Sequence, residues 1–172
     1  MYRLCKNPVL ALWLLSLTVF VWSPEASSNR QGYTLAQLVK ATDVIVYARV
    51  SGVDPKPVLK ALNPVQVLRV SIEIKSCYKR MTGRVIQDKK NMKILYLTGG
   101  SEQPVLVPGS EYVFFLEDSD IGPFPLNGLD SALLVKEGVV STEFVEDLPK
   151  EMPFADLKER LKRLAGRFGC DD

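Results

Sequence analysis

The chain has 172 residues, with 22 Lys and Arg against 20 Asp and Glu, and it contains no histidine. This near-neutral balance argues against a dedicated nucleic-acid binder, and the absence of histidine removes the usual general base and the commonest zinc ligand. Any catalysis would have to rest on Lys, Asp, Glu, Tyr or Cys side chains.

Residues 1–28 have the layout of a secretory signal peptide. Arg3 and Lys6 precede an apolar run from Pro8 to Trp22, and the small residues Ala26 to Ser28 follow it. A permanent membrane span needs about 20 apolar residues, so this run is too short for one. We expect cleavage before Asn29, a single mature domain over residues 29–172 without a stable membrane span, and a secreted or periplasmic location.

The first elements of the mature chain are a short helix and two strands. Thr34 and Gln37 have the spacing of a capping box, which predicts a helix over Thr34–Lys40. The β-branched run Val44–Val50 predicts a mostly buried strand. Val65–Lys75 alternates apolar and polar residues, so we expect a long strand with one face in the core and the other in water.

The second half of the chain predicts further strands and a closing helix. Ile94–Leu97 and the strongly apolar Tyr112–Leu116 are typical of strands, and the latter should lie centrally in the sheet. Ala132–Val135 and Val139–Val140 flank Gly138 as in a hairpin in which that glycine has a positive φ. After Pro153, an apolar stripe predicts an amphipathic helix packed on the core, formed by Phe154, Leu157, Leu161, Leu164 and Phe168.

Five or six such strands between two helices favour a mainly β fold. We predict a small antiparallel OB-type barrel with a short N-terminal helix and a C-terminal amphipathic helix. A β-sandwich is the alternative that fits the strand count nearly as well.

The three cysteines are Cys5, which is lost with the leader, and Cys77 and Cys170. Two thiols in an oxidising compartment can form one disulfide between the middle of the chain and its C-terminus. The alternative is a buried Cys77 that behaves as a small hydrophobic residue and a Cys170 in a frayed terminus.

The densest charge feature lies between the second and third predicted strands. We consider it a candidate binding site for an extracytoplasmic anionic glycan, a lipid headgroup surface or an acidic protein, formed by Lys75, Tyr78, Lys79, Arg80 and Arg84. The alternative is a solvated edge strand that lysines protect from edge-to-edge pairing. Nucleic acid is not expected, because Tyr78 is the only obvious stacking aromatic there.

Motifs for catalysis are missing from the sequence. There is no G-x-S-x-G elbow or phosphate loop, and without histidine no Ser-His-Asp or Cys-His pair can form. We expect no enzyme, no cofactor and no metal site, and favour a secreted binding or interaction module. The alternative is an extracytoplasmic enzyme that uses carboxylates alone, such as a glycosidase-like hydrolase with two facing acids.

Three segments resemble a known family: Leu35–Val50, Lys75–Lys79 and Val107–Leu116. Together they are similar to the netrin-like module of the tissue inhibitors of metalloproteinases, and to small secreted bacterial proteins of that shape. The resemblance covers about Thr34 to Leu116 and implies an OB barrel used for binding. Those inhibitors bind zinc through an N-terminal Cys-x-Cys, whereas the expected mature chain starts Asn29-Arg30-Gln31, so inhibition by that route is not expected.

Overall fold

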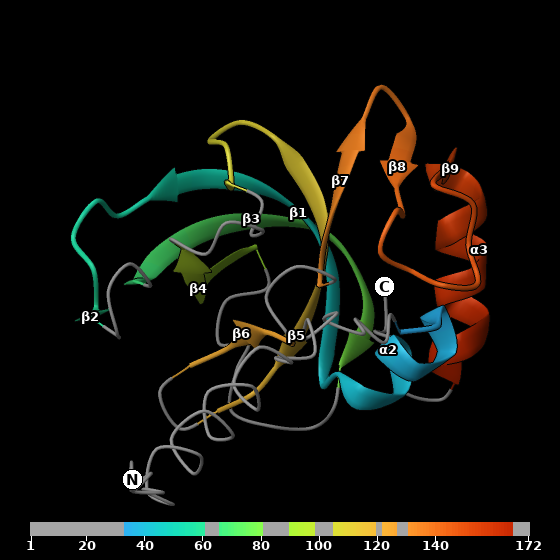
Figure 1. Cartoon of the computed structure of the whole chain (residues 1–172), viewed down its shortest axis with the longest axis horizontal. Helices are drawn as coiled ribbons and strands as arrows, with labels where there is room; N and C mark the ends of the chain where they lie inside the picture. The colour runs from blue at the N-terminus through green and yellow to red at the C-terminus, as the bar shows by residue number, and fades with distance from the viewer. Residues whose placement is uncertain are drawn as a thin grey trace, which may run out of the picture. The chain divides into compact units, whose positions relative to one another are not determined.

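Figure 1 shows the computed structural model, which describes residues 33–60, 66–80, 90–98, 105–119, 122–126 and 131–166. The chain divides into two units, Met1–Gln31 and Gly32–Asp172, and every described residue belongs to the second. The predicted signal peptide lies outside the described residues, so its cleavage stays a prediction. Across the described ranges, no helix has the length and apolar character that crossing a bilayer requires.

The described part of the second unit is mainly β, with nine strands and two helices (Figure 1). Helix α2 spans Leu35–Ala41 and helix α3 spans Phe154–Ala165. The strands are β1 (Val44–Val53), β2 (Leu59–Lys60), β3 (Gln66–Arg80), β4 (Asn91–Thr98), β5 (Glu111–Glu117), β6 (Phe124–Pro125), β7 (Ala132–Lys136), β8 (Val139–Ser141) and β9 (Glu151–Pro153).

All nine strands pair antiparallel in one sheet, in the order β2-β3-β1-β5-β7-β8-β9, with β4 on β3 and β6 on β5. One continuous sheet differs from the two separate sheets that a β-sandwich stacks. Within the described residues no strand ladder joins β4 to β6. One backbone bond runs from Leu95 N of β4 to the O of Pro123, the residue before β6, at 2.8 Å. The predicted barrel is therefore not confirmed, because its closing ladder is not shown.

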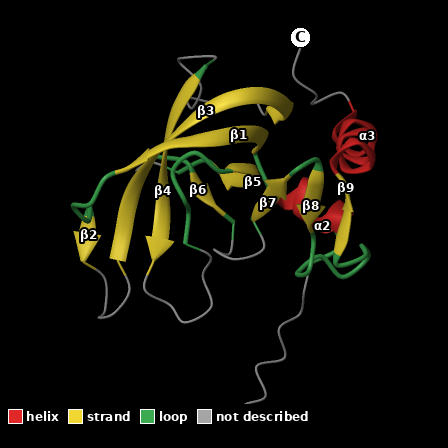
Figure 2. Cartoon of the chain, turned by 90° about the horizontal axis from the view of Figure 1, so that it is seen from above, coloured by secondary structure: helices red, strands yellow, loops and turns green. Residues whose placement is uncertain are grey.

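The sheet has a core on each face. The inner core takes alternate residues of β1, β3, β4 and β5, among them Val46, Val50, Ile72, Ile94 and Phe114. The helix-side core fills the opposite face beneath α2 and α3, among others with Leu38, Ile45, Phe115, Leu157 and Leu161. Strands β1 and β5 contribute to both cores, which confirms that the two most apolar segments are buried and central. Figure 2 shows α3 beside β8 and β9, the end of the sheet that the helices cover.

Strand β3 is longer than predicted and irregular. Val70 and Ile72 are buried while Arg69 and Glu73 are exposed, as the alternation predicts. The pairing with β1 then shifts register twice, because Lys75 and Tyr78 have no partner residue on β1. Such bulges turn side chains to a new face and bend the strand. The sequence pattern alone did not predict the continuation to Arg80.

Both helices follow from local signals. Thr34 caps α2 through a complete capping box with Gln37, as predicted. Helix α3 buries Leu157, Leu161 and Ala165, whereas Leu164 is 40% exposed, so its predicted place in the core stripe was wrong. A four-residue repeat keeps Ala165 below Leu161, while Leu164 is rotated off that line. Phe168 lies outside the described residues.

The β7–β8 hairpin turns at Glu137 and Gly138, which have φ of 52° and 79°. Two successive positive φ values are typical of the tight turn that joins twisted antiparallel strands. The predicted glycine conformation is confirmed.

Candidate functional site

The segment before β5, residues 105–110, exposes two apolar side chains. We call it the valine loop. Val105 is 76% exposed and Val107 is 50% exposed, whereas Leu106 between them is 5% exposed and packs in the inner core. Leu106 therefore anchors the loop, and its two neighbours point to solvent.

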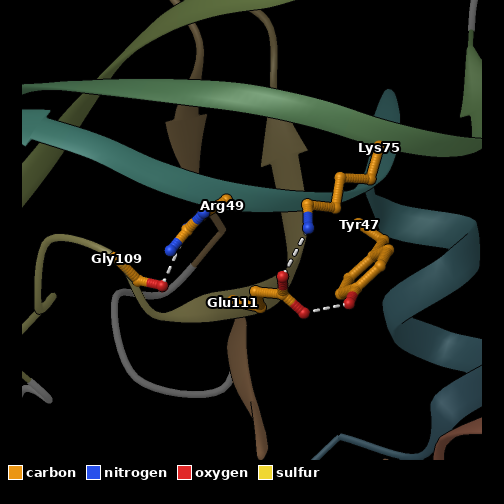
Figure 3. Close-up of polar contacts among 5 residues, drawn as sticks. All are labelled: Tyr47, Arg49, Lys75, Gly109 and Glu111. Atoms are coloured by element: carbon orange, nitrogen blue, oxygen red, sulfur yellow. Dashed lines mark hydrogen bonds and ion pairs between the residues drawn. The ribbon is translucent and has the colours of Figure 1, made fainter.

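Hydrogen bonds hold the valine loop against β1. Gly109 N donates to Val50 O at 2.8 Å, and Val50 N donates to Ser110 O at 2.9 Å. Arg49 Nε donates to Gly109 O at 3.0 Å (Figure 3). Gly109 has a φ of 90°, which favours glycine at the turn. The loop is thus fixed to a central strand, and its exposed valines are held in place before any partner arrives.

Two further exposed apolar residues lie on β7 and β8, the two strands that follow β5 in the sheet. Leu134 on β7 is 39% exposed and pairs directly with Tyr112, whose hydroxyl accepts a bond from Val107 N at 3.3 Å. Val139 on β8 is 41% exposed, and the register puts it diagonal to Leu134 on the same face. Diagonal neighbours of this kind lie about 7–8 Å apart. We call these four residues, Val105, Val107, Leu134 and Val139, the apolar strip.

A polar cluster lies at the root of the loop, around the Glu111 carboxylate (Figure 3). Lys75 Nζ lies 2.5 Å from Glu111 Oε1, and the Tyr47 hydroxyl donates to Glu111 Oε2. Arg49 is the direct neighbour of Glu111 in the β1–β5 register. We call Tyr47, Arg49, Lys75 and Glu111 the Glu111 cluster.

Alternation along β3 explains how Lys75 joins the Glu111 cluster. Ile74 packs against the inner core, so Lys75 after it points to the opposite face, where Arg49 and Glu111 lie. Lys75 is on β3 and Glu111 is on β5, with β1 between them, and the long side chain reaches over β1 to the carboxylate. Lys75 itself has no partner on β1, because Tyr47 pairs with Ser76 and Ala48 with Ile74.

The electrostatics of the cluster keep Glu111 ionised. Its hydrogen bonds from Lys75 and then Tyr47 lower the pKa of the Glu111 carboxyl below its usual value. Burial, and next the bond to Glu111, raise the pKa of Tyr47 to about 12. The Tyr47 ring also packs on Phe154, the first residue of α3, with centroids 4.5 Å apart. Glu111 therefore links β3, β1 and β5 to the start of α3.

This geometry does not suit a catalytic acid. A general acid needs a raised pKa, whereas that of Glu111 is lowered and each of its oxygens already accepts a bond. Glu73 is the nearest acid on the same face. It lies on β3 and pairs with Arg49 on β1, so it is two strand spacings from Glu111 on β5, or roughly 10 Å. That backbone spacing is about twice the separation of a retaining carboxylate pair and close to the upper end for an inverting pair, but Arg49 lies between the two acids.

Two members of the predicted basic site are buried. Tyr78 is 3% exposed in the helix-side core, and burial raises its pKa to about 12. Lys79 is 4% exposed, and its Nζ donates to Val39 O at 2.7 Å and also to Thr42 O, at the end of α2. As placed, neither presents a surface to a ligand, because the β3 bulge turns this end of the strand inward.

The other members of the predicted basic site do not gather either. Lys75 belongs to the Glu111 cluster, Arg80 is exposed at the end of β3, and Arg84 lies outside the described residues. The structure therefore does not bring the five residues to one described surface.

Cys77 is disulfide-bonded and packs partly against the inner core. Cys5 and Cys170 both lie outside the described residues, so the pairing with Cys170 stays a prediction.

Sequence reasoning missed the valine loop and Glu111. Three consecutive apolar residues before Pro108-Gly109 offered a weak signal, but nothing local shows that only Leu106 of the three is buried. Glu111 lacks a sequence signal, because its partners on β1 and β3 are about 36 to 64 positions away in the chain.

No protein-family model matches the chain, and no curated protein matches it in sequence. Among the described residues, no three His, Cys, Asp or Glu side chains come together as metal ligands would. The apolar strip and the Glu111 cluster are therefore interpreted from their geometry.

Replacing Glu111 by Gln is expected to lower the free energy of unfolding by about 1 kcal/mol at neutral pH, since the contacts are partly exposed. The folded-state pKa of Glu111 is lowered from 4.5, so its contribution is present above that pH and is lost as the pH falls through the folded-state value. The difference between wild type and Glu111→Gln in urea unfolding should therefore shrink in acid. Glu151→Gln, on the exposed edge of β9, is the control. A difference that stays constant with pH would show that ionised Glu111 does not stabilise the fold.

Proposed function

We propose that this protein is a non-catalytic interaction module, secreted or periplasmic, which binds a partner protein through the apolar strip. The observation that carries the proposal is the pair of valines exposed on a loop that is hydrogen-bonded to a central strand. The leader-like sequence of residues 1–28 supports the location.

We further propose that the fold is a netrin-like OB-type barrel. The consecutive pairing of β5, β1, β3 and β4 around the inner core supports this. Closing the barrel would need a ladder between β4 and β6, where β6 pairs with β5 and Leu95 N bonds to Pro123 O. The zinc-binding Cys-x-Cys start of the metalloproteinase inhibitors is missing. The module would therefore bind its partner through the strip instead of through its N-terminus.

A protein partner fits the chemistry of the strip better than a small ligand does. Exposed apolar side chains that lie together mark interaction surfaces. Preorganisation of a loop lowers the entropy lost on binding, and here Arg49, Val50 and Tyr112 hold the valine loop. The Glu111 cluster lies on the opposite face of the sheet from Leu134, so it supports the root of the loop and does not border the strip.

The carboxylate-enzyme alternative gains no support from the cluster. Such an enzyme needs one carboxyl to donate a proton and another to act on the substrate. Glu111 is held as an ionised acceptor by Lys75 and Tyr47, which is the arrangement of a structural contact.

Site-specific photo-cross-linking tests the proposal. A photoreactive side chain at position 107 of the full-length protein should capture one protein from native extracytoplasmic extract, in a saturable way. The same probe at position 164, on the exposed side of α3, is the matched control, because Leu164 is about as exposed as the strip residues. The captured protein is then purified and titrated against wild type and Val107→Asp.

The expected result is capture at position 107 but not at 164, and a loss of affinity of about tenfold or more for Val107→Asp. Equal capture at both positions, or a purified partner that binds Val107→Asp as well as wild type, would overturn the proposal.

A further inference from the structure

Charge is unevenly distributed over the sheet, and the excess of cations falls on β3 and β4. Residues 66–80 and 90–98 carry six of the 22 Lys and Arg residues but only one of the 20 Asp and Glu residues. The cations are Arg69, Lys75, Lys79, Arg80, Lys90 and Lys93, and the acid is Glu73. We call residues 66–80 and 90–98 the arm. The arm is basic although the whole chain is near neutral.

Arg69 and Lys93 lie on the outer face of the arm. Their neighbours Val70, Ile72, Met92 and Ile94 point into the inner core, so alternation directs the two cations away from it. Ser71 pairs with Lys93 and Arg69 pairs with Leu95, which makes the two cations diagonal neighbours about 7–8 Å apart.

Arg49 adds a third cation to this face on the adjacent strand β1. Arg49 pairs with Glu73, which lies two residues after Ser71 on the same face of β3. Its Nε holds Gly109 O, which leaves the remaining guanidinium N–H groups without a hydrogen-bond partner among the described residues. We call Arg49, Arg69 and Lys93 the basic face.

Two other cations of the arm already make contacts within the fold. Lys75 is paired with Glu111 and Lys79 is buried, so neither belongs to the basic face. Among the described residues, Arg69 and Lys93 make no ion pair and no side-chain hydrogen bond. Two acids lie nearby: Glu73 on the same face, and Asp54, whose backbone N donates to Arg69 O and whose Oδ1 accepts from Lys56 N.

We propose that the basic face binds a linear acidic polysaccharide, one that carries sulfate or carboxylate groups. Polar side chains lie among these cations: Ser71 can bond sugar hydroxyls, Ser51 can accept from them although its own hydroxyl donates to Ser71 O at 3.1 Å, and Glu73 and Asn91 lie beside them. Spaced cations among hydroxyl groups are complementary to a hydrated polyanion whose charges repeat along a chain. Arg49 also holds Gly109 of the valine loop, but Arg69 and Lys93 lie on β3 and β4, whereas Leu134 and Val139 of the apolar strip lie on β7 and β8. The proposal does not depend on the function proposed for the apolar strip.

Other anionic macromolecules fit less well. A protein interface centres on exposed apolar or aromatic anchors. Leu95, the direct partner of Arg69, is only 7% exposed, and Leu97, two residues further along β4, is 38% exposed, so the apolar surface beside the cations is small. Single-stranded nucleic acid is bound with stacking aromatics, whereas Tyr47, two residues from Arg49 on β1, is packed against Phe154 and bonded to Glu111. A polysaccharide that is bound mainly through its charges needs neither.

The experiment measures binding of the full-length protein to heparin, alginate, polyglutamate and single-stranded DNA over a salt series. Arg69→Ser with Lys93→Ser is the test variant. Arg160→Ser with Arg163→Ser is the control, because it removes the same charge from the exposed side of α3. We expect the test variant to weaken heparin or alginate binding about tenfold, and the control to change it by less than about threefold.

Three outcomes would overturn the proposal. Equal losses of affinity in the test and control variants would mean that binding depends on net charge alone. If the protein bound neither heparin nor alginate, the proposed site would be wrong. Tighter binding of polyglutamate or DNA than of either polysaccharide would assign the face to an acidic protein or a nucleic acid. The Arg69→Ser and Lys93→Ser variant should still bind the protein captured at position 107 as well as wild type does, which separates this result from failure of the apolar strip.

Discussion

Replacing Lys79 by methionine is expected to lower the free energy of unfolding by about 3 kcal/mol. The ammonium group of Lys79 is the buried donor for Val39 O and Thr42 O at the C-terminal end of α2. The last carbonyls of a helix have no partner within the helix, so another part of the fold must supply one. Methionine keeps the length and packing of the side chain but leaves both carbonyls without this donor.

Burial itself opposes the charge on Lys79. Desolvation lowers the pKa of Lys79 below its usual value, and the nearby Asp43 carboxylate partly offsets this. The charge is nevertheless kept in contact with carbonyl oxygens, which compensate for part of the lost hydration. A large loss on mutation would therefore reflect unsatisfied carbonyls more than a favourable buried charge.

Urea unfolding at neutral pH measures the effect, with Lys93→Met as the control. Lys93 is exposed on β4, and a surface change of this kind should stay within about 0.5 kcal/mol. If Lys79→Met matched the control, Lys79 would not stabilise the end of α2.

Loss of the disulfide at Cys77 is expected to destabilise the protein by roughly 4 kcal/mol. With Cys170 as the partner, the bond closes a loop of nearly 100 residues, and long loops restrict the unfolded chain most. Cys77→Ser should therefore unfold at a clearly lower urea concentration than wild type, and a reducing agent should bring wild type close to the variant.

Peptide mapping without reduction identifies the partner of Cys77. A linked peptide that contains Cys77 and Cys170 is expected from the protein purified without reducing agent, and Cys170→Ser should then be as unstable as Cys77→Ser. A free Cys170, or a Cys170→Ser variant as stable as wild type, would contradict the pairing.

Local signals in the sequence were sufficient for most secondary-structure elements. The capping box at Thr34, the apolar runs of β1 and β5, and Gly138 in its hairpin all depend on neighbours within a few positions, and the structure confirms each of them. The excess of basic residues between the second and third predicted strands was also visible, but not which of its members reach solvent.

The sequence by itself therefore determined the mainly β class, the order of most of its elements and the two central strands, because these depend on local periodicity and composition. Only the tertiary structure decided that Lys79 is a buried helix cap, that Glu111 joins Tyr47 and Lys75, and that Val107 is exposed beside a buried Leu106. The physical reason is register: two bulges in β3 change the face to which its side chains point, and the resulting contacts join residues that are far apart in the chain.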